Sequence, residues 1–531
     1  MRQKPLALSG ALILASAPSL PAPAQAAPRE KDGPRRLNII HIMTDDHSYQ
    51  AISAYGHPLS AQAPTPNMDR LAREGIRFDK AYVENSLSTP SRACLMTGLY
   101  SHQNGQRTLG AGIDTTVTFV SELLRQGGYQ TAMIGKWHMQ CEPKGFDFYY
   151  VLRGQGEYYT PTFKSHDSDG RYLPEEGYAT DLITDHAIEF LESRDPDKPF
   201  CLYVHHKAPH RNWLPDVKNL DLYEDITFPL PATFHDDYSG KGEAARVQRM
   251  TIDQDMSMIY DLKISELEDE PTRSGHTKNM LERGLARMDS VSRAKWDAAY
   301  GPRNRAFLES GLEGEELLEW KFQRYIRDYL RCIRSVDDSV GEILEYIDTH
   351  GLADNTIVVY TSDQGFNMGE HGWFDKRFMY EESFRTPLII RYPGGKAGKV
   401  SNAFIQNLDF APTYLDIAGV EAPEEMSGRS ILPVIRKGGK EPCKWRKYMY
   451  YHYYDLPSEH NVLKHDGVAD KRYKLIHFYG GAEGDYSEFY DLRKDPDEMT
   501  DLISDKRYRR RIARLQKRLD DFRVRLGVDE Y

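Results

Sequence analysis

Two pairs of oxygen-bearing side chains directly follow two strongly apolar runs in the sequence. Asp45 and Asp46 follow the first run, and Asp363 and Gln364 follow the second. In open α/β sheets, functional residues gather just past the carboxyl ends of the strands. Carboxylate and amide oxygens are hard donors, which suit Ca²⁺ or Mg²⁺ better than zinc. An Asp after a strand also commonly caps the next helix, so one pair alone leaves both interpretations equally open. Two pairs at two strand ends favour a metal site.

A serine followed by a proline and an arginine is a second candidate for chemistry. Pro90 suits the first turn of a helix, so the sequence predicts a helix from about Ser88 to Gly98. A group on Ser88 would lie at the positive end of that helix, which favours an oxyanion. Arg92 follows one turn later on the same face. Taken alone, this short pattern favours the simpler interpretation of a helix-capping serine and a surface arginine.

The elements that must position these residues alternate between strands and helices. Nearly continuous apolar strands are typical of a parallel sheet covered on both faces. Such runs occupy residues 37–44, 129–135, 199–205 and 356–361. Helices are predicted at 67–74 and 121–126, and a long one at about 316–350, where apolar residues recur every three or four positions. The pattern predicts an α/β fold with a mainly parallel central sheet.

The sequence changes character near residue 440, where glycines and a proline interrupt it. Short aromatic strands follow at 448–454 and 473–479, and then a last amphipathic helix. We therefore expect a catalytic domain at 36–440 and a small C-terminal α+β subdomain, an antiparallel sheet plus a helix, at 441–531. The polar, methionine-rich stretch at 222–303 predicts loops and short helices near the mouth of the active site.

The N-terminus, the net charge and the cysteines limit the class of protein. Residues 1–26 have a basic start, an apolar stretch and an Ala-Gln-Ala cleavage site, so they read as a signal peptide. We expect export to the periplasm or outside a bacterial cell, with no membrane span. The net charge of −11 argues against nucleic acid as a partner. The five cysteines, none at metal-ligand spacing, suggest buried thiols with at most two disulfides.

Four motifs in order resemble those of the type I, formylglycine-dependent sulfatases. SLSTPSRACLMTG at 86–98 and GYQTAMIGKWH at 128–138 are similar to the two signatures of that family. TSDQG at 361–365 and DKRFMYEESFRTPL at 375–388 resemble its C-terminal metal and lysine segments. The similarity extends from Asn38 to about Leu502. It implies an alkaline-phosphatase-like α/β sandwich with a small C-terminal subdomain.

The resemblance also implies a modified nucleophile and a metal. In the family, the first residue of the signature, here Ser88, is oxidised to formylglycine. The serine-type signature implies a bacterial host with an anaerobic radical maturase as a partner during biosynthesis. Asp45, Asp46, Asp363 and Gln364, with modified Ser88, match the ligands of Ca²⁺, and Mg²⁺ is an alternative. Gln364 departs from the commoner asparagine, and its amide oxygen lies one methylene further out.

The remaining roles follow the same motifs. The hydrated aldehyde would attack sulfur after Arg92 and the metal favour its deprotonated form. Lys136 and Lys376 would hold the sulfate oxygens, His210 would protonate the departing alcohol, and His138 would accept the second diol proton. Arg377 beside Lys376, and the pair His205 and His206 before His210, are the alternatives that the sequence leaves open. His371 receives no role.

The substrate is the least determined feature. Residues 204–213, 464–468 and 473–479 look most like bacterial N-acetylglucosamine-6-O-sulfatases, which implies a sulfated host glycan such as heparan fragments or mucin. We expect the segment near His460 and His465 to reach the pocket and contact the sugar. Two other functions stay open: a phosphate or phosphonate ester hydrolase of the same superfamily, and a catalytically silent glycan-binding protein in which Ser88 is never oxidised.

Overall fold

The computed structural model describes residues 36–268 and 275–531, so the predicted signal peptide at 1–26 lies outside the described residues. Within these ranges, ten strands form one sheet. In spatial order they are β13 (Lys399–Ser401), β2 (Ile76–Phe78), β12 (Leu388–Arg391), β9 (Thr356–Ser362), β1 (Asn38–Thr44), β8 (Phe200–His205), β4 (Gln130–Gly135), β5 (Phe148–Leu152), β6 (Thr162–Ser165) and β7 (Leu173–Pro174). The five inner strands from β9 to β5 run parallel, and antiparallel neighbours join at β12 and β6.

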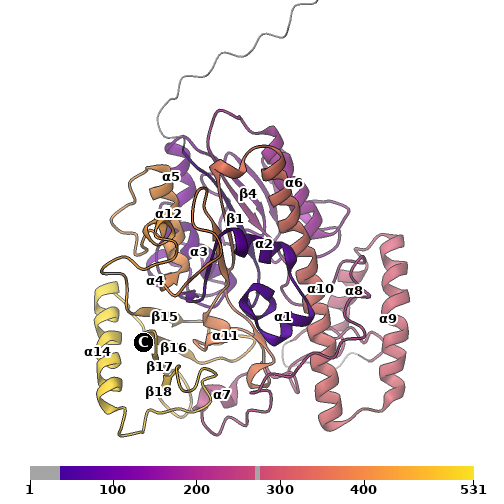
Figure 1. Cartoon of the computed structure of the whole chain (residues 1–531). Coiled ribbons are helices and arrows are strands. Elements are labelled where there is room, and N and C mark those ends of the chain that lie inside the picture. Colours follow the sequence, from indigo (N-terminus) through magenta and orange to yellow (C-terminus); the bar gives the residue numbers. More distant parts are fainter. Residues whose placement is uncertain (1–35, 269–274) are drawn as a thin grey trace, which may run out of the picture. The chain divides into compact units, whose positions relative to one another are not determined.

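Helices cover both faces of this sheet (Figure 1). Because side chains alternate along a strand, Ile40 and Ile42 of β1 pack on one face while Ile39 and Met43 pack on the other. On the first face lie α2 (Pro66–Glu74), α6 (Ala179–Ser193) and α10 (Gly314–Thr349). On the second lie α3 (Ser88–Thr97), α5 (Val120–Gln126) and α12 (Phe410–Ala418). The predicted α/β sandwich, with its mainly parallel sheet, is confirmed.

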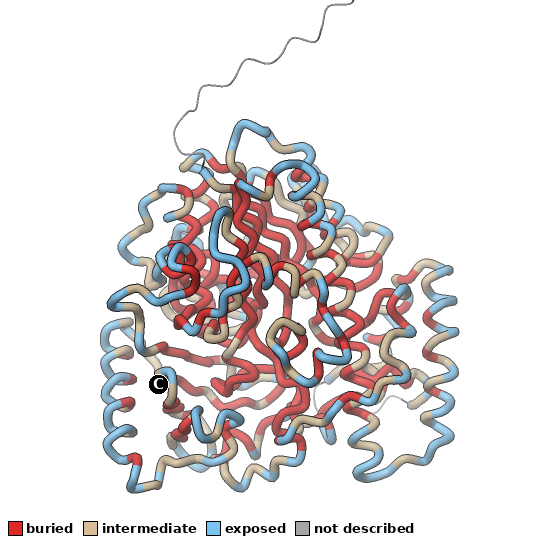
Figure 2. Tube along the Cα trace, viewed as in Figure 1, coloured by how far each residue is buried: buried red, intermediate tan, exposed pale blue. Residues whose placement is uncertain are grey.

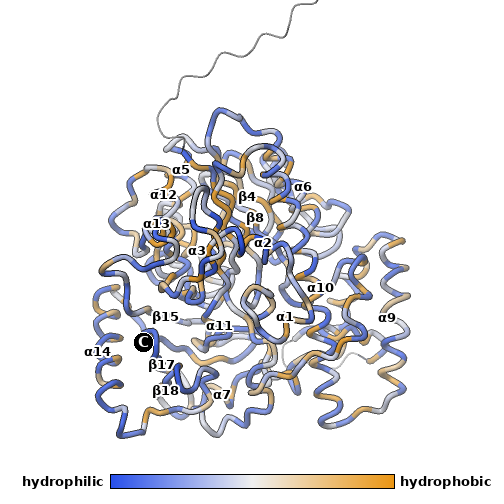
Figure 3. Tube along the Cα trace, viewed as in Figure 1, coloured by the Kyte–Doolittle hydropathy of each residue, from blue (hydrophilic) through white to orange (hydrophobic). Residues whose placement is uncertain are grey.

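The central strands are buried on both faces, as their apolar sequences predicted. Every residue of β1, β8 and β9 is buried. In Figure 2 the sheet region is red, and in Figure 3 hydrophobic residues gather at β4 and β8. This burial holds the strand ends rigid, which is what a precise site at those ends needs.

The C-terminal part is a second sheet with one helix. The strands β15 (Met449–Tyr453), β16 (Lys464–Ala469), β17 (Tyr473–Tyr479) and β18 (Tyr486–Asp491) pair antiparallel in that order, and α14 (Arg509–Leu526) packs on one face. In β15, Tyr450 faces α14, whereas Tyr451 faces the segment of Phe378 and Tyr380. This arrangement confirms the predicted antiparallel sheet and helix, while the domain boundary near residue 440 stays a prediction.

The stretch at 222–303 differs from its prediction in one element. Besides the short helices α7 (Glu243–Val247) and α8 (Lys278–Leu285), it begins the 21-residue helix α9 (Ser290–Ser310). Pro302 lies inside α9, although a proline usually interrupts a helix. Within this continuous helix the buried rings of Trp296 and Tyr300, one turn apart, stack with their centroids 3.9 Å apart.

Smaller elements complete the described chain. They are α1 (Pro58–Gln62), α4 (Ser101–Asn104), α11 (Glu381–Phe384), α13 (Leu432–Arg436), the strand pair β3 (Ala81–Tyr82) with β14 (Ile405–Gln406), and the pair β10 (Asn367–Met368) with β11 (Phe374–Asp375). Among the described helices, none is long and apolar enough to cross a membrane. All five cysteines are unpaired thiols, and Cys94, Cys201 and Cys332 are buried.

Candidate active site

The register of two parallel strands brings the two acidic pairs together. Thr44 at the end of β1 lies opposite Ser362 at the end of β9, so the residues that follow are neighbours. The backbone N–H of Asp46 donates to Asp363 Oδ1 at 3.1 Å. The hydroxyl of Tyr329, on α10, donates to the carbonyl of Asp46 at 2.6 Å and holds the backbone that follows β1 in place. The two strand ends therefore form one carboxylate cluster, as the sequence predicted.

Ser88 lies beside this cluster at the start of a buried helix. It is the first residue of α3, after the N-cap residue Leu87, so the interpretation of Ser88 as the helix cap is wrong. Its hydroxyl donates to Asp45 Oδ1 at 2.8 Å, and Gln364 Nε2 lies 3.5 Å from its Oγ. The positive end of α3 thus faces a group at Ser88, which favours a negative charge there.

Arg92 is a buried part of the site and not a surface arginine. Its side chain is 1% exposed. Nε and Nη2 donate to Asp363 Oδ2 at 3.2 and 2.9 Å, and Nη1 donates to the carbonyl of Lys136 at 2.6 Å. Nη1 also lies 3.3 Å from His205 Nδ1. Arg92 therefore joins the end of β4 to the carboxylate cluster.

Lys136 reaches the cluster because β4 ends at a glycine. Gly135 has φ +94°, and a Cβ there would lie 2.0 Å from the carbonyl oxygen of His205, so only glycine fits. The ammonium of the next residue, Lys136, donates to Asp45 and to Gln155 Oε1, the latter at 2.5 Å. Lys136 is fully buried, so its pairing with Asp45 offsets the cost of burying the charge.

Lys376 and its neighbour Arg377 point to different partners. Lys376 Nζ donates to Asp46 Oδ2 at 2.6 Å, whereas the guanidinium of Arg377 pairs with Asp375. The C-terminal sheet supports this segment, since Tyr451 donates its hydroxyl to the carbonyl of Arg377. The geometry favours Lys376 over Arg377 as the cation nearest the carboxylate cluster.

The three clustered carboxyls differ in their electrostatics. Burial would raise the pKa of Asp45, but the nearby charges of Lys136, His210 and Arg92 hold it well below its ordinary value. Burial, only partly offset by Lys376, raises the pKa of Asp46 to about 6. Burial and the charge of Asp45 raise the pKa of Asp363 to about 7. The cluster thus places three carboxyls among three cations, and the raised pKa values of Asp46 and Asp363 come from burial and from the closeness of the like-charged carboxylates.

The donor set fits a divalent cation. Asp45, Asp46 and His210 offer ligand atoms that lie within 4.8 Å of one another. Gln364 is fully buried, and its Oε1 has no hydrogen-bond partner within the described chain, although its Nε2 donates to Asp46. A buried amide oxygen without a partner is costly unless a ligand takes it. Three carboxylates and this oxygen are the hard donors that Ca²⁺ or Mg²⁺ prefers.

The two predicted catalytic histidines contact different parts of the site. His210 Nε2 is 3.8 Å from Asp46 Oδ2, and its Nδ1 lies 2.8 Å from the carbonyl of Arg211. A carbonyl can only accept, so Nδ1 carries the proton and Nε2 faces the site. His138 contacts Thr89 Oγ1 through Nδ1 at 3.4 Å, one residue from Ser88.

The other histidines named by the sequence lie elsewhere. His206 contacts Ser339 at 3.1 Å in the core, and His371 pairs with Asp236 at 2.8 Å. The ring of His205 contacts the site at Arg92, and its backbone carbonyl accepts from the N–H of Lys136 at 2.7 Å. His460 lines the cavity and lies 3.1 Å from Asp375, but His465 is buried against the backbone of Met379. The expectation that the segment near His460 reaches the pocket is confirmed, and that for His465 is wrong.

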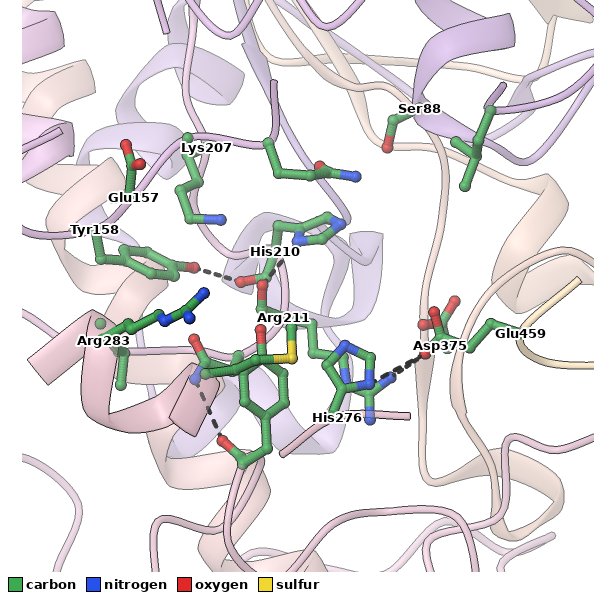
Figure 4. Close-up of a pocket in the computed structure, with 18 of the residues that line it drawn as sticks. Ser88, Glu157, Tyr158, Lys207, His210, Arg211, His276, Arg283, Asp375 and Glu459 are labelled. Atoms are coloured by element: carbon green, nitrogen blue, oxygen red, sulfur yellow. Dashed lines mark hydrogen bonds and ion pairs between the residues drawn. The ribbon is translucent and has the colours of Figure 1, made fainter. Parts of the chain in front are cut away.

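Ser88 lies at one edge of a cavity of about 710 Å³ (Figure 4). Sequence reasoning gave no role to much of its lining: Gln155, Glu157, Tyr158, Lys207, Arg211, Asn212, Tyr260, His276, Arg283, Arg287, Asp375 and Glu459. These residues come from loops, from α8 and from the segment before β16, far apart in the chain. The charged residues in the polar stretch at 222–303 were the one available signal, because that stretch was expected at the mouth.

Known proteins resemble this chain in sequence and in fold. A family model described as sulfatase matches residues 37–420, which is most of the chain. The chain belongs to the sulfatase family. It is therefore a sulfuric ester hydrolase, and its fold is the alkaline-phosphatase-like sandwich that the motifs implied. A second model, described as the C-terminal part of N-sulphoglucosamine sulphohydrolase, matches residues 369–525 of this sulfatase.

Individual relatives show which sulfatases this chain resembles in sequence and structure. An N-acetylglucosamine-6-O-sulfatase of Bacteroides thetaiotaomicron is 48% identical over 502 residues, which cover 94% of this chain and 88% of the relative. The structure of BT4656 in complex with its substrate D-glucosamine-2-N,6-O-disulfate has a TM-score of 0.88 at 48% identity, covering 93% of this chain and 99% of that one. A phosphonate monoester hydrolase of Agrobacterium radiobacter, at 20% identity and a TM-score of 0.64 over 92% and 96% of the two chains, shares the fold alone.

Proposed function

We propose that this sulfatase hydrolyses the 6-O-sulfate ester of a glucosamine residue in a host glycan, through a formylglycine made from Ser88. One observation carries the proposal: Ser88, at the positive end of α3, lies among three carboxylates with Arg92, Lys136 and Lys376 around them. The choice of sugar is supported by the 48% identity to the N-acetylglucosamine-6-O-sulfatase. A leader at 1–26 would export the chain, after the anaerobic maturase has acted on Ser88.

The cation and the modified residue supply the reactive centre. We assign a divalent cation, Ca²⁺ first and Mg²⁺ second, to Asp45, Asp46, Asp363, Gln364 and the group at position 88. When bound, the cation polarises sulfate oxygens and favours a deprotonated nucleophile. The hydrated formylglycine would supply an oxygen nucleophile and a second hydroxyl, and deprotonation of that hydroxyl would expel the sulfate and restore the aldehyde.

The cationic side chains prepare the site for an anion. Lys136 and Lys376 are held in place by Asp45 and Asp46, so their positions need no reorganisation when sulfate binds. Burial lowers the pKa of Lys376, but the charges of Asp375 and Asp46 raise it more, so this ammonium stays protonated at neutral pH. Arg92, fixed by Asp363, contributes charge next to the nucleophile. Together these groups would stabilise the charge that develops on sulfate during transfer.

The two histidines would move protons. Burial and the charge of Lys136 lower the pKa of His138 well below its ordinary value, so its ring is neutral and can accept a proton. Burial also lowers the pKa of His210. The anionic sulfate ester, bound beside His210, would favour the charged form of its ring, in which Nε2–H can donate to the departing sugar oxygen.

The proposal is tested on protein co-expressed with the anaerobic maturase. The peptide that contains Ser88 should lose about two mass units when the serine hydroxyl is oxidised to the aldehyde. The same protein should release sulfate from 6-O-sulfated glucosamines and act far more slowly on the matching phosphate ester. Unmodified serine in fully active protein would refute the nucleophile, and cleavage of other sulfate esters with none at the 6-position would refute the substrate.

A further inference from the structure

One buried cation of the active-site cavity has no counter-ion. Lys207 is 5% exposed, lines the cavity, and has no hydrogen bond or ion pair within the part of the chain that the structure describes. Lys136 and Lys376, in contrast, each pair with an aspartate. A buried ammonium is costly unless it is paired, so an unpaired one that faces a cavity indicates an anionic ligand group.

Its surroundings keep Lys207 pointed into the cavity. Its Nζ lies 4.7 Å from the centroid of the Tyr158 ring, and the Tyr158 hydroxyl donates to the carbonyl of His210 at 2.6 Å. Lys207 and His210 close one tight turn, since His210 N donates to Lys207 O at 3.0 Å. The lysine is therefore held on the same rigid turn as the proposed proton donor. Burial and the charge of Lys136 lower the pKa of Lys207 to about 8, so it is still mostly charged at neutral pH.

A second cation lies on the same side of the cavity. In Figure 4, Arg283 of α8 reaches toward the cavity on the side of Lys207, and Ser88 lies on the opposite side. Arg283 has no ion pair among the described residues. Glu157, a carboxylate on this wall, accepts from the backbone N–H of Thr162 at 3.2 Å and lies 3.9 Å from Arg287 Nη1. The wall opposite Ser88 is therefore positively charged overall.

The geometry of the sugar ring determines which substituent of the proposed substrate would lie at this wall. In a pyranose, C2 and C5 lie across the ring from each other, and the 6-O-sulfate extends from C5 through C6. A sugar whose 6-O-sulfate lies at Ser88 thus presents its C2 substituent toward the opposite wall. On glucosamine that substituent is an acetamide, a free ammonium or an N-sulfate, and of these only the N-sulfate is an anion.

We propose that Lys207, with Arg283 beside it, forms a second anion-binding subsite that recognises an N-sulfate on C2 of the sugar whose 6-O-sulfate is cleaved. This inference rests on the proposed function and goes beyond it, since it assigns a preference among 6-O-sulfated glucosamines to two named residues. Lys207 would act as a specificity residue, outside the bond-breaking step.

Three substrates that differ only at C2 test the proposal: glucosamine 6-sulfate as the N-sulfate, the N-acetyl and the free amine. The matured enzyme should have the highest kcat/KM for the N-sulfate and the lowest for the amine. Losing one charge-assisted hydrogen bond corresponds to roughly ten- to a hundredfold. Lys207→Met should therefore lower the ratio of N-sulfate to N-acetyl kcat/KM by about tenfold or more, and Lys207→Arg should recover part of it. Arg283→Gln should lower the same ratio less, because Arg283 is exposed.

The control variant is Lys218→Met, an exposed lysine that pairs with Asp181 outside the cavity and should leave the ratio unchanged. An equal loss on all three substrates in Lys207→Met would overturn the proposal, because it would place Lys207 at the cleaved sulfate or in the fold. Binding separates this outcome from failure of the proposed function. Glucosamine N-sulfate, which has no ester to cleave, should bind the native enzyme more tightly than N-acetylglucosamine, and Lys207→Met should abolish the difference. Equal binding of the two sugars by the native enzyme would refute the subsite whatever the turnover.

Discussion

Replacing Arg92 with methionine tests the central electrostatic arrangement of the site. Methionine keeps the length of the apolar stem but removes two hydrogen bonds to Asp363 and one to the carbonyl of Lys136. Asp363 is fully buried, so it would lose its arginine without gaining water. Breaking a buried pair by removing one partner costs about 3–5 kcal/mol of unfolding free energy.

The expected shift in melting temperature follows from the size of the chain. Unfolding entropy of about 2.1 cal/mol/K per residue gives roughly 1 kcal/mol/K for a chain of this length. A loss of about 3–5 kcal/mol therefore corresponds to a fall of about 3–5 °C in chelator-treated protein. A bound cation would supply part of the missing positive charge beside Asp363, so added Ca²⁺ should shrink the difference between Arg92→Met and the native protein.

Thermal unfolding with and without Ca²⁺ measures both effects. The matched control is Arg334→Met on α10, which breaks a half-exposed pair with Asp338 at 2.7 Å. Such pairs contribute about 0–1 kcal/mol, so this variant should melt within about 1 °C of the native protein. The reasoning is refuted if Arg92→Met melts like the control, or if Ca²⁺ leaves its deficit unchanged.

Three further predictions concern catalysis, the cation and pH. His210→Ala should slow release of sulfate from a sugar by roughly a hundredfold or more. It should affect 4-nitrophenyl sulfate little, because a good leaving group needs no proton donor. Equal losses on the two substrates in steady-state assays would exclude His210 as the general acid. Gln364→Met removes the unpartnered amide oxygen and should weaken Ca²⁺ binding, measured by calorimetry, at least roughly tenfold. Gln364→Glu keeps an oxygen donor and should retain binding. Native affinity in the methionine variant would exclude Gln364 as a ligand. The preference in kcat/KM for N-sulfated over N-acetylated substrate should fall as pH rises through about 8, because Lys207 then loses its charge. Burial and the charge of Lys136 lower the pKa of Lys207 to about 8, although the charges of Asp45 and Glu157 oppose this. A pH profile of that ratio that is flat from 7 to 9 would contradict the charge assigned to Lys207.

The sequence was sufficient for elements whose signal is local. Continuous apolar runs located β1, β8 and β9 within one or two residues, because a strand buried on both faces needs apolar residues throughout. The acidic pairs after β1 and β9 could be placed together because parallel strands end at one edge of a sheet. The helix start at Ser88 followed from Pro90 and the end from Gly98.

The ordered motifs carried the family and the fold, which the comparisons confirm. They also named Arg92, Lys136, His138, His210 and Lys376, whose individual roles stay predictions. The structure adds which of these lie near Ser88 and Asp46 and what holds each in place. For Arg92 this changes the interpretation, because the local pattern alone favoured a surface position.

Only the tertiary structure determines which residues form the wall of the cavity opposite Ser88 and which groups surround each ionisable side chain. Lys207, Arg283, Asp375 and His460 come from segments far apart in the chain, and no local periodicity in the sequence records which segments meet. His460 and His465 looked equivalent in sequence, yet strand pairing buries His465 while His460 lines the cavity. Sequence thus determined which chemistry the protein can carry, since that depends on residue types at strand and helix ends. Packing determined which charges are buried and left unpaired, since burial and neighbours exist only once distant segments meet.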